Sequence, residues 1–309
     1  MSDIVIQSGR SAVELAFFVI LPVMIVMLTI MRLAEAKGIL DWMVRRLEPV
    51  LRPFGLPGTG LLALFQNVLV SAFAPLATLS VMDRSDIPRR QLAATLALVM
   101  GSAQANAVFP LAALGMAGLE TVLISIVSGL IGAALTYHLF ARHLPKRDPI
   151  AEPEIQHATA DDAKGILAVI SRAGGEAFRI TVSALPMLVL SLTAVNGLRA
   201  LGVMGMVEEA LSPAFDAVGL PSLTALLAIT KYLAGGSAMM AVAADAVNSG
   251  QLTLMDLDRV AGLLIHPLDV AGVAILMSAG PRVGQVIRPA ILGALAAVVL
   301  RTVMHLLLF

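Results

Sequence analysis

Charged and titratable side chains occur inside apolar segments of this chain, where a charged group is costly and usually has a function. Lys231 lies in one such segment, and His266 and Asp269 lie in another. A carboxylate in that environment can exchange a proton or hold a sodium ion, and an ammonium group can hold an anion. The residue types therefore predict ion coupling by His266 and Asp269 and substrate contact by Lys231. The alternative for Lys231 is that its side chain reaches the membrane surface and is solvated there.

The segment that holds His266 and Asp269 has a centre that interrupts a helix. In His266-Pro267-Leu268-Asp269 the proline lacks the backbone N–H donor that a helix needs. The matching position, 165 residues earlier, reads Gly101-Ser102-Ala103-Gln104 and is followed by Asn106. Unwound backbone at mid-membrane exposes carbonyl groups and half-helix ends, which bind ions and charged substrate groups. We therefore expect Gln104 and Asn106 to contact a substrate; the alternative is that these polar groups only satisfy one another between helices.

The composition is that of a membrane protein and excludes several other classes. The chain is 58% hydrophobic and 14% charged, and its mean hydropathy of +0.90 exceeds what a water-soluble domain of this size tolerates. There is no Cys, no cluster of metal ligands, no nucleophile motif and no phosphate-binding glycine loop, so we expect no metal, no cofactor and no enzyme activity. The net charge is zero, which favours no nucleic-acid partner. Residues 1–10 lack the features of a cleaved signal peptide, so the first apolar segment is expected to remain.

The chain contains the same module twice, with an offset of 164 residues. Gly38 falls on Gly202, and Gly55-Leu56-Pro57 falls on Gly219-Leu220-Pro221. Glycine and proline carry backbone information, so these matches indicate shared bends as well as shared hydrophobicity. An internal duplication of apolar segments is typical of secondary transporters, in which the substrate site lies at the repeat interface.

Each copy contains four apolar segments of about spanning length, which is roughly 20 residues, and one shorter amphipathic stretch. The amphipathic stretches, 39–54 and 203–218, have apolar residues at helical spacing and are predicted to lie in the membrane interface. We expect 1–142 to form repeat 1, 143–176 a cytoplasmic linker and 177–309 repeat 2. The apolar segments are 12–31, 60–82, 92–114 and 119–141 in the first copy, and 177–198, 222–244, 260–280 and 289–309 in the second.

The distribution of Lys and Arg indicates how often each copy crosses the membrane, because these residues accumulate on the cytoplasmic side. If all eight segments crossed, the 20 such residues other than Lys231 would divide 12 to 8. If 60–82 and 222–244 are re-entrant hairpins instead, the copies are inverted and the division is 16 to 4, with Arg301 among the four. We therefore predict an all-α integral membrane fold of two inverted repeats in a bacterial-type inner membrane, with both termini periplasmic.

Each repeat then consists of a long span, an interfacial helix, a re-entrant hairpin and two spans. This order resembles the transport core of the concentrative nucleoside transporters and the broader group of nucleoside-recognition Gate-domain membrane proteins, and the paired Gly-Leu-Pro motifs support the resemblance. The nucleoside transporters carry a Gln-Thr-Glu-Ala-Pro run at the first hairpin tip, and its Glu contacts the substrate. Here Ala74-Pro75 match the end of that run, but Ser71-Ala72-Phe73 replace its first three residues. The resemblance implies the transporter architecture, with a tip that lacks this carboxylate.

We expect the hairpin tips to meet the two broken centres near the middle of the membrane. The predicted function is secondary active transport of a small polar solute, nucleoside-like or a small organic anion, by alternating access coupled to H⁺ or Na⁺. The alternative is a non-transporting membrane subunit that acts with a partner protein. The expected partners are a small-molecule substrate and the lipid bilayer, without nucleic acid, and a homo-oligomer is left open. The predicted substrate-binding residues are Gln66, Asn67, Ser71, Phe73, Gln104, Asn106, Lys231, Gly235, Gly236 and Ser237.

Overall fold

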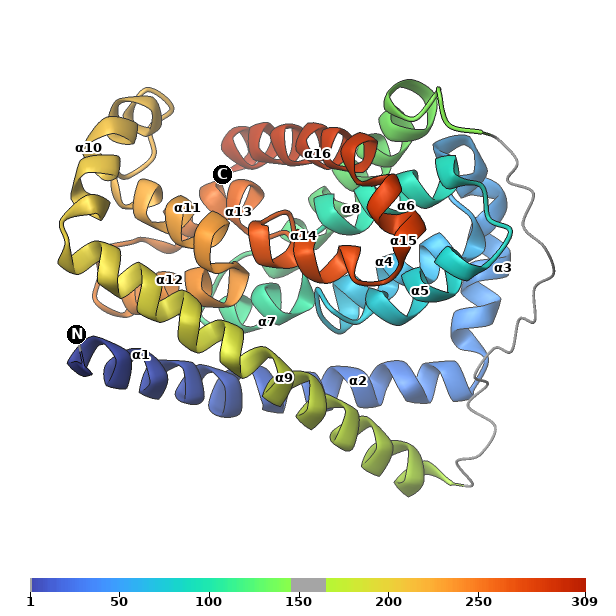
Figure 1. Ribbon diagram of the computed structural model, residues 1–309, viewed down its shortest axis with the longest axis horizontal. Coiled ribbons are helices and arrows are strands. Elements are labelled where there is room, and N and C mark those ends of the chain that lie inside the picture. Colours follow the sequence, from blue (N-terminus) through green and yellow to red (C-terminus); the bar gives the residue numbers. More distant parts are fainter. Residues whose placement is uncertain (1, 146–164) are drawn as a thin grey trace.

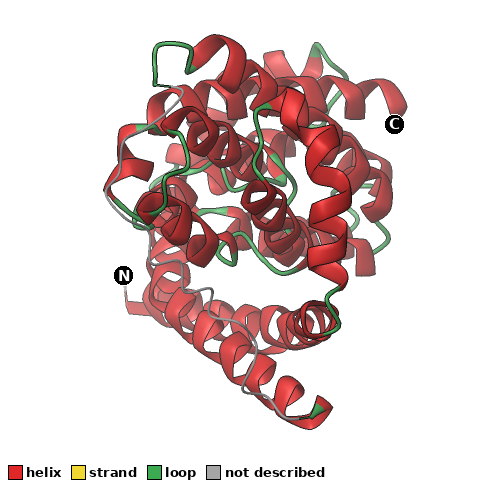
Figure 2. Cartoon of the chain, turned by 90° about the vertical axis from the view of Figure 1, so that its right-hand side faces the viewer, coloured by secondary structure: helices red, strands yellow, loops and turns green. Residues whose placement is uncertain are grey.

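The computed structural model describes residues 2–145 and 165–309, and every regular element in these two ranges is helical. Long helices form one side of the molecule in Figures 1 and 2. There, α1 (Ser2–Glu14) and α2 (Leu21–Ala36) run in one line, and α9 (Ile166–Ala200) packs across them. Most of the remaining helices pack together on the other side of α1, α2 and α9. Most of the predicted linker lies outside the described residues.

The first long helix is nearly continuous, because a π-helical turn, Leu15–Ile20, joins α1 to α2 just before Pro22. The wider turn accommodates the proline ring, which clashes with the carbonyl four residues earlier in a regular α-helix. In repeat 2, α9 begins at Ile166, inside the range that the sequence assigned to the linker. An ion pair holds this early part of α9 on α2: Nη2 of Arg32 lies 2.9 Å from both carboxylate oxygens of Glu176.

A shorter helix follows each long one at positions matched by the 164-residue offset. These are α3 (Ile39–Leu51) and α10 (Val203–Asp216). Each begins directly after a glycine in the left-handed region, with φ of +67° at Gly38 and +74° at Gly202. Residues with a Cβ rarely adopt this conformation, so the two matched glycines determine where the chain leaves the long helix.

The same two helices end in matched turns. Gly55 and Gly219 both have positive φ, +76° and +68°. In each turn the leucine after the glycine donates its backbone N–H to a carbonyl five residues earlier, which closes the end of the helix. The duplication seen in the sequence is therefore present in the backbone conformation. The two hydrogen bonds are Leu56 N to Leu51 O at 3.4 Å and Leu220 N to Phe215 O at 2.9 Å.

Each segment predicted to be a hairpin forms two short helices that pack against each other. Hairpin 1 consists of α4 (Gly58–Leu69) and α5 (Pro75–Arg84), and hairpin 2 consists of α11 (Leu223–Ala234) and α12 (Gly236–Asn248). The first limb of each has 12 residues. At 1.5 Å per residue that limb is about 18 Å long, well short of the roughly 30 Å of a bilayer core.

The spans that follow the hairpins are interrupted where the sequence predicts. In repeat 1, α6 (Arg89–Gly101) and α7 (Ala105–Ala113) are separated by residues 102–104, which we call break 1. In repeat 2, α13 (Leu254–Leu264) and α14 (Val270–Met277) are separated by residues 265–269, break 2. Helix α13 begins before the predicted start of its span because Thr253 and Asp256 form a capping box at its N-terminus.

Three further helices complete the fold: α8 (Gly118–Leu135), which ends in a π-helical turn, the short α15 (Pro281–Gln285) and α16 (Ile287–Leu308). Helix α6 packs against both α8 and α16, and its residues from Leu92 to Gly101 are all buried. Within the described residues, three helical stretches are long and apolar enough to cross a membrane: Arg89–Ala113, Gly118–Phe140 and Ile287–Leu308.

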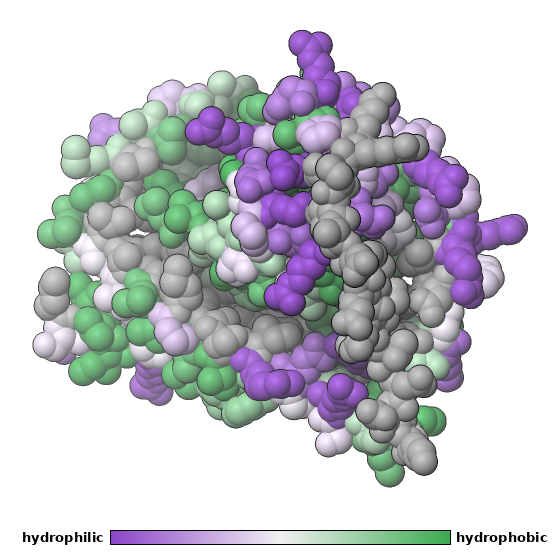
Figure 3. All heavy atoms as spheres, turned by 45° about the vertical axis from the view of Figure 1, so that its right-hand side comes forward, coloured by the Kyte–Doolittle hydropathy of each residue, from purple (hydrophilic) through white to green (hydrophobic). Residues whose placement is uncertain are grey.

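Exposed arginines gather at one end of the molecule. Arg45 and Arg46 of α3, Arg84 at the end of α5 and Arg142 after α8 are all exposed, and these elements lie at the same end in Figure 1. Figure 3 shows hydrophilic residues collected on this side, whereas hydrophobic residues dominate the other end. The N-terminus lies at the opposite end.

Candidate functional site

Break 1 leaves backbone carbonyls without helical partners, and hairpin 1 supplies a side chain to them. Ser102 and Gln104 have extended backbone, with ψ of 156° and 130°. Asn67 of α4 is fully buried, and its Nδ2 lies 3.3 Å from Val99 O, 3.4 Å from Ser102 O and 3.2 Å from Ala103 O. The oxygen of the same carboxamide is buried and has no hydrogen-bond partner among the residues that the structure describes. Asn67 therefore holds the unwound segment of its own repeat.

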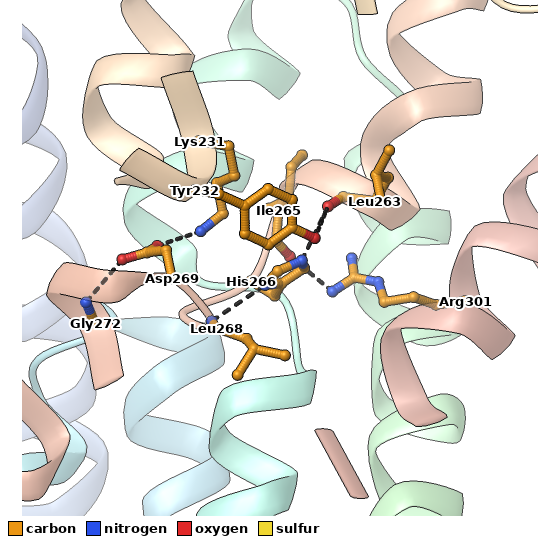
Figure 4. A network of polar contacts seen from close by, with 9 residues as sticks. All are labelled: Lys231, Tyr232, Leu263, Ile265, His266, Leu268, Asp269, Gly272 and Arg301. Carbon is orange, nitrogen blue, oxygen red and sulfur yellow. Dashed lines mark hydrogen bonds and ion pairs between the residues drawn. The ribbon is translucent and has the colours of Figure 1, made fainter. Parts of the chain in front are cut away.

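Break 2 is stabilised by His266, which is fully buried (Figure 4). Its Nδ1 accepts a hydrogen bond from Leu268 N at 3.1 Å, so the proton of the neutral ring lies on Nε2. That nitrogen is 2.9 Å from Leu263 O and donates to it. Both ring nitrogens are thus used within the break. Helix α13 ends at Leu264, so the spacing of three between His266 and Asp269 does not place them on one helical face.

Asp269 begins α14 and pairs with Lys231. Its Oδ1 accepts from Gly272 N at 2.7 Å, which caps the helix, and its Oδ2 accepts from Nζ of Lys231. Lys231 comes from α11, the first limb of hairpin 2, and is fully buried rather than extended to the surface. Lys231 is also the residue that matches Asn67 in the 164-residue offset. Each hairpin therefore directs a polar side chain from the same position into the break of its own repeat.

The hairpin tips also contact break 1 and the helix after it. Gly236 at the tip of hairpin 2 lies so close to Gln104 that a Cβ there would be 2.1 Å from Nε2 of the carboxamide. Asn106 accepts a hydrogen bond at Oδ1 from Ala72 N, at 3.1 Å, in the tip of hairpin 1. Neither the carboxamide of Gln104 nor Nδ2 of Asn106 has a hydrogen-bond partner among the described residues. Free amide groups therefore lie where hairpin 2 meets repeat 1.

The other predicted residues make contacts within the hairpins. Gln66 accepts at Oε1 from Thr78 Oγ1 at 2.7 Å, which joins the limbs of hairpin 1. The Ser71 hydroxyl accepts from Phe73 N and Ala74 N and so shapes its own turn. Gly235 has φ of +88° and forms the turn between α11 and α12. The side chain of Ser237 lies outside the described residues. Substrate contact by these residues stays a prediction.

Arg301 is a central residue that the sequence analysis did not assign to the site. It was counted with the charges of the periplasmic side, but its side chain is fully buried in α16. Nη1 lies 2.7 Å from Ile265 O in break 2 and 3.4 Å from Gly101 O at the end of α6. The signal for this role was present: an arginine well inside a 22-residue apolar helix. Among the described residues, no three His, Cys, Asp or Glu side chains come together in a way that would hold a metal ion.

Comparisons with known proteins identify the fold. Residues 17–120 match the family model named Gate, described as nucleoside recognition. No curated protein matches the chain in sequence. Among solved structures, CNTnw in an inward-facing substrate-bound state aligns with a TM-score of 0.67 and 14% identity, over 99% of this chain and 82% of that one.

A variant of CNTnw in an outward-facing state aligns with a TM-score of 0.70 and 13% identity, over 94% of this chain and 75% of that one. At this level of identity the likeness establishes the fold. It confirms the resemblance that the element order and the paired Gly-Leu-Pro motifs indicated. The chain has the all-helical membrane fold of the concentrative nucleoside transporter CNTnw and carries a nucleoside-recognition Gate match over residues 17–120.

Proposed function

We propose that this chain is a secondary transporter that moves a small polar solute across the membrane by alternating access. The observation that carries the proposal is the contact between Gln104 and Gly236, in which a free carboxamide of repeat 1 lies on the hairpin tip of repeat 2. A solute bound there would touch both halves of the duplicated chain. Relative movement of the halves would then open the site to one side and afterwards to the other. The similarity to CNTnw in outward-facing and inward-facing states supports this mechanism.

The polar groups that remain free suggest the class of solute. Gln104 offers one acceptor and two donors, and Asn106 offers further donors at Nδ2. These groups match the edge of a heterocyclic base or another amide-like group. In the described part of the site, the charge of Asp269 is already balanced by Lys231, and the tip of hairpin 1 carries no carboxylate. We therefore favour an uncharged nucleoside-like solute over a small organic anion.

The coupling ion is proposed to be H⁺ or Na⁺, and two places in the site suit a cation. The carbonyl oxygens that surround Asn67 are hard ligands of the kind that small cations bind. At Asp269, a proton or a sodium ion would compete with Lys231 for the carboxylate. We keep Asp269 as the coupling residue. His266 uses both ring nitrogens inside break 2, so its part is to shape the backbone around Asp269.

We further propose that the two repeats are inverted in an inner membrane, with both termini periplasmic and the linker cytoplasmic. The short limbs of the hairpins support re-entry from one face. The exposed arginines of α3, α5 and the end of α8 at one end of the molecule support a cytoplasmic position for that end.

Purified protein in liposomes tests the proposed function. We expect uptake of a labelled nucleoside such as uridine above protein-free liposomes, and thermal stabilisation of the detergent-purified protein by the same compound. Both effects should disappear in Gly236→Leu and remain in Gly205→Ala, whose added methyl group faces open space on α10. Uptake of succinate without any nucleoside would overturn the proposed solute class. If no solute is taken up and none stabilises the protein, a non-transporting subunit becomes the better interpretation.

A further inference from the structure

Arg301 lies fully buried in the apolar helix α16. None of the ion pairs between described residues involves it, so it has no carboxylate partner among them. Two of its nitrogens, Nε and Nη2, are buried and have no hydrogen-bond partner in the described part of the chain. A buried charge that lacks a counter-charge is costly, and an apolar side chain at this position would pack at lower cost. Structural support of α16 alone therefore gives a poor explanation for an arginine here.

The contacts of the Arg301 nitrogen Nη1 give a better explanation for an arginine at this position. This single nitrogen donates to Ile265 O at 2.7 Å and to Gly101 O at 3.4 Å (Figure 4 shows the first contact). Gly101 is the last residue of α6, and Ile265 directly follows α13, so both carbonyls lie at helix C-termini. Carbonyls there lack helical partners and carry the negative end of the helix dipole. The two positions also correspond in the duplication at the 164-residue offset.

We propose that Arg301 is a positioning residue that joins break 1 and break 2 into one cooperative unit. Its charge balances the C-terminal ends of two half-helices that belong to opposite repeats. Break 1 carries Gln104 and is held by Asn67, and break 2 carries Asp269. A change in the bonding of Asp269 would therefore reach break 1 through the shared guanidinium. The link to solute movement rests on the proposed function. The connection that Arg301 makes between break 1 and break 2, which we call the brace, is measurable without uptake.

Hydrogen–deuterium exchange on detergent-purified protein tests the brace. The informative amides are those of Ser102, which donates to Leu98 O, and Ile265, which donates to Ala261 O. Hydrogen bonds to a charged group stabilise the closed form of each break, so their loss should make local opening more frequent. Arg301→Met should therefore speed exchange at both breaks by about 10- to 150-fold. Thr302→Ala, a change at the next residue of α16, should leave both breaks unchanged, because its hydroxyl bonds only within the helix to Val298 O.

A second substitution, Asp269→Asn, tests directly whether break 2 is coupled to break 1. With Arg301 present, Asp269→Asn should speed exchange at break 1 as well as at break 2. In the Arg301→Met background, the same substitution should speed exchange at break 1 no more than it speeds exchange in helices remote from both breaks. Arg301→Lys keeps a charged donor and should recover part of the protection at both breaks together. If Arg301→Met proves unstable, Arg301→Gln takes its place in the comparison.

Exchange that increases at one break alone, or uniformly through the molecule, would overturn the proposal. So would a break 1 that ignores Asp269→Asn while Arg301 is present. These outcomes do not depend on uptake, so a failed transport assay with intact coupling between the breaks would refute the proposed function and leave the brace standing.

Discussion

Lys231 and Asp269 form an ion pair in the interior of the molecule, with side chains that are 0% and 4% exposed. The pair closes break 2 from hairpin 2, whereas the matching position in repeat 1 is the neutral Asn67. The two halves of a duplicated fold therefore stabilise equivalent backbone breaks by different chemistry. Of the two breaks, only the second is contacted by an ionisable side chain of its own hairpin, and for this reason we propose ion coupling in repeat 2.

Removing one partner of this pair should be strongly destabilising. Asp269→Asn leaves Lys231 buried without a counter-charge, which lowers the free energy of unfolding by about 3–5 kcal/mol in comparable buried pairs. Replacing both residues, as in Lys231→Met with Asp269→Leu, leaves no buried charge and should recover most of the loss. Thermal unfolding in detergent compares the single and the double variant with the unmodified protein. Equal stability of the single and double variants would show that the pair does not act as a unit.

The same pair predicts how uptake depends on an ion gradient. The double variant Lys231→Met with Asp269→Asn removes both charges of this pair, so position 269 can neither release a proton nor bind a sodium ion through a carboxylate. We expect it to exchange solute across the membrane at equilibrium but to lose accumulation driven by a pH or sodium gradient. Counterflow and gradient-driven uptake in the same proteoliposomes separate the two activities. Gradient-driven accumulation at the wild-type level would remove Asp269 from the coupling mechanism.

A methyl group at Gly236 should disturb binding more than stability. The added Cβ would lie 2.1 Å from Nε2 of Gln104, which is the far end of a flexible side chain and can move aside. Gly236→Ala should therefore leave the midpoint of thermal unfolding nearly unchanged while solute affinity falls. Adding Gln104→Ala to the Gly236→Ala variant removes the side chain that the new methyl group would meet. It should not restore solute affinity, because the Gln104 carboxamide itself is the proposed contact with the solute. A thermal-shift titration checks both variants, and wild-type affinity in Gly236→Ala would argue against this site.

Much of the fold was predictable because glycine and proline act locally. Pro267, the Gly235-Gly236 pair and the matched glycines at 38 and 202 interrupt or turn the chain wherever it is placed, so their positions in the sequence indicate the breaks. The amphipathic stretches likewise became α3 and α10. These features depend on neighbouring residues alone.

Contacts between segments that are distant in the sequence were harder to predict. Arg301 bonds to a carbonyl 200 residues away, and no spacing along the chain indicates that partner. Ser71 looked like a ligand residue because it lies at a hairpin tip, but its hydroxyl serves its own turn. His266 and Asp269 are three residues apart, a spacing that would place them on one face of a continuous helix. The helix ends before them, and each bonds to backbone of the break or to hairpin 2 instead.

The matched glycines of the two Gly-Leu-Pro turns should differ in their tolerance of substitution. Both have positive φ, so an alanine at either position should cost about 1–2 kcal/mol of stability. At Gly55 the new Cβ would also lie 2.1 Å from the ring of Tyr137, and overlap of this kind adds about 1–3 kcal/mol. At Gly219 the nearest atoms are 3.5 Å away in Arg259. The midpoint temperature of thermal unfolding should therefore be lower for Gly55→Ala than for Gly219→Ala. The reverse order would contradict the steric argument.

Single cysteines can test the inverted topology, because the chain has none of its own. Ser85 follows hairpin 1 but is buried, with its hydroxyl donating to Met82 O, so the neighbouring exposed Asp86 is the better position. Asp86→Cys should react with a membrane-impermeant thiol reagent only from the cytoplasmic side, since the arginine-rich end carries this turn. Ser249→Cys, exposed after hairpin 2, should react only from outside.

The comparison is informative because the two residues follow equivalent hairpins. In inverted repeats these positions face opposite compartments, whereas four full crossings in each copy would place them on the same side. Labelling in whole cells and in inside-out vesicles gives the two accessibilities, and a permeant reagent shows that each cysteine is reactive at all. Ser2→Cys, exposed at the start of α1, should behave like Ser249→Cys if the N-terminus is periplasmic. Labelling of Asp86→Cys and Ser249→Cys from one side would make hairpin 1 or hairpin 2 a full span and would refute the inverted arrangement.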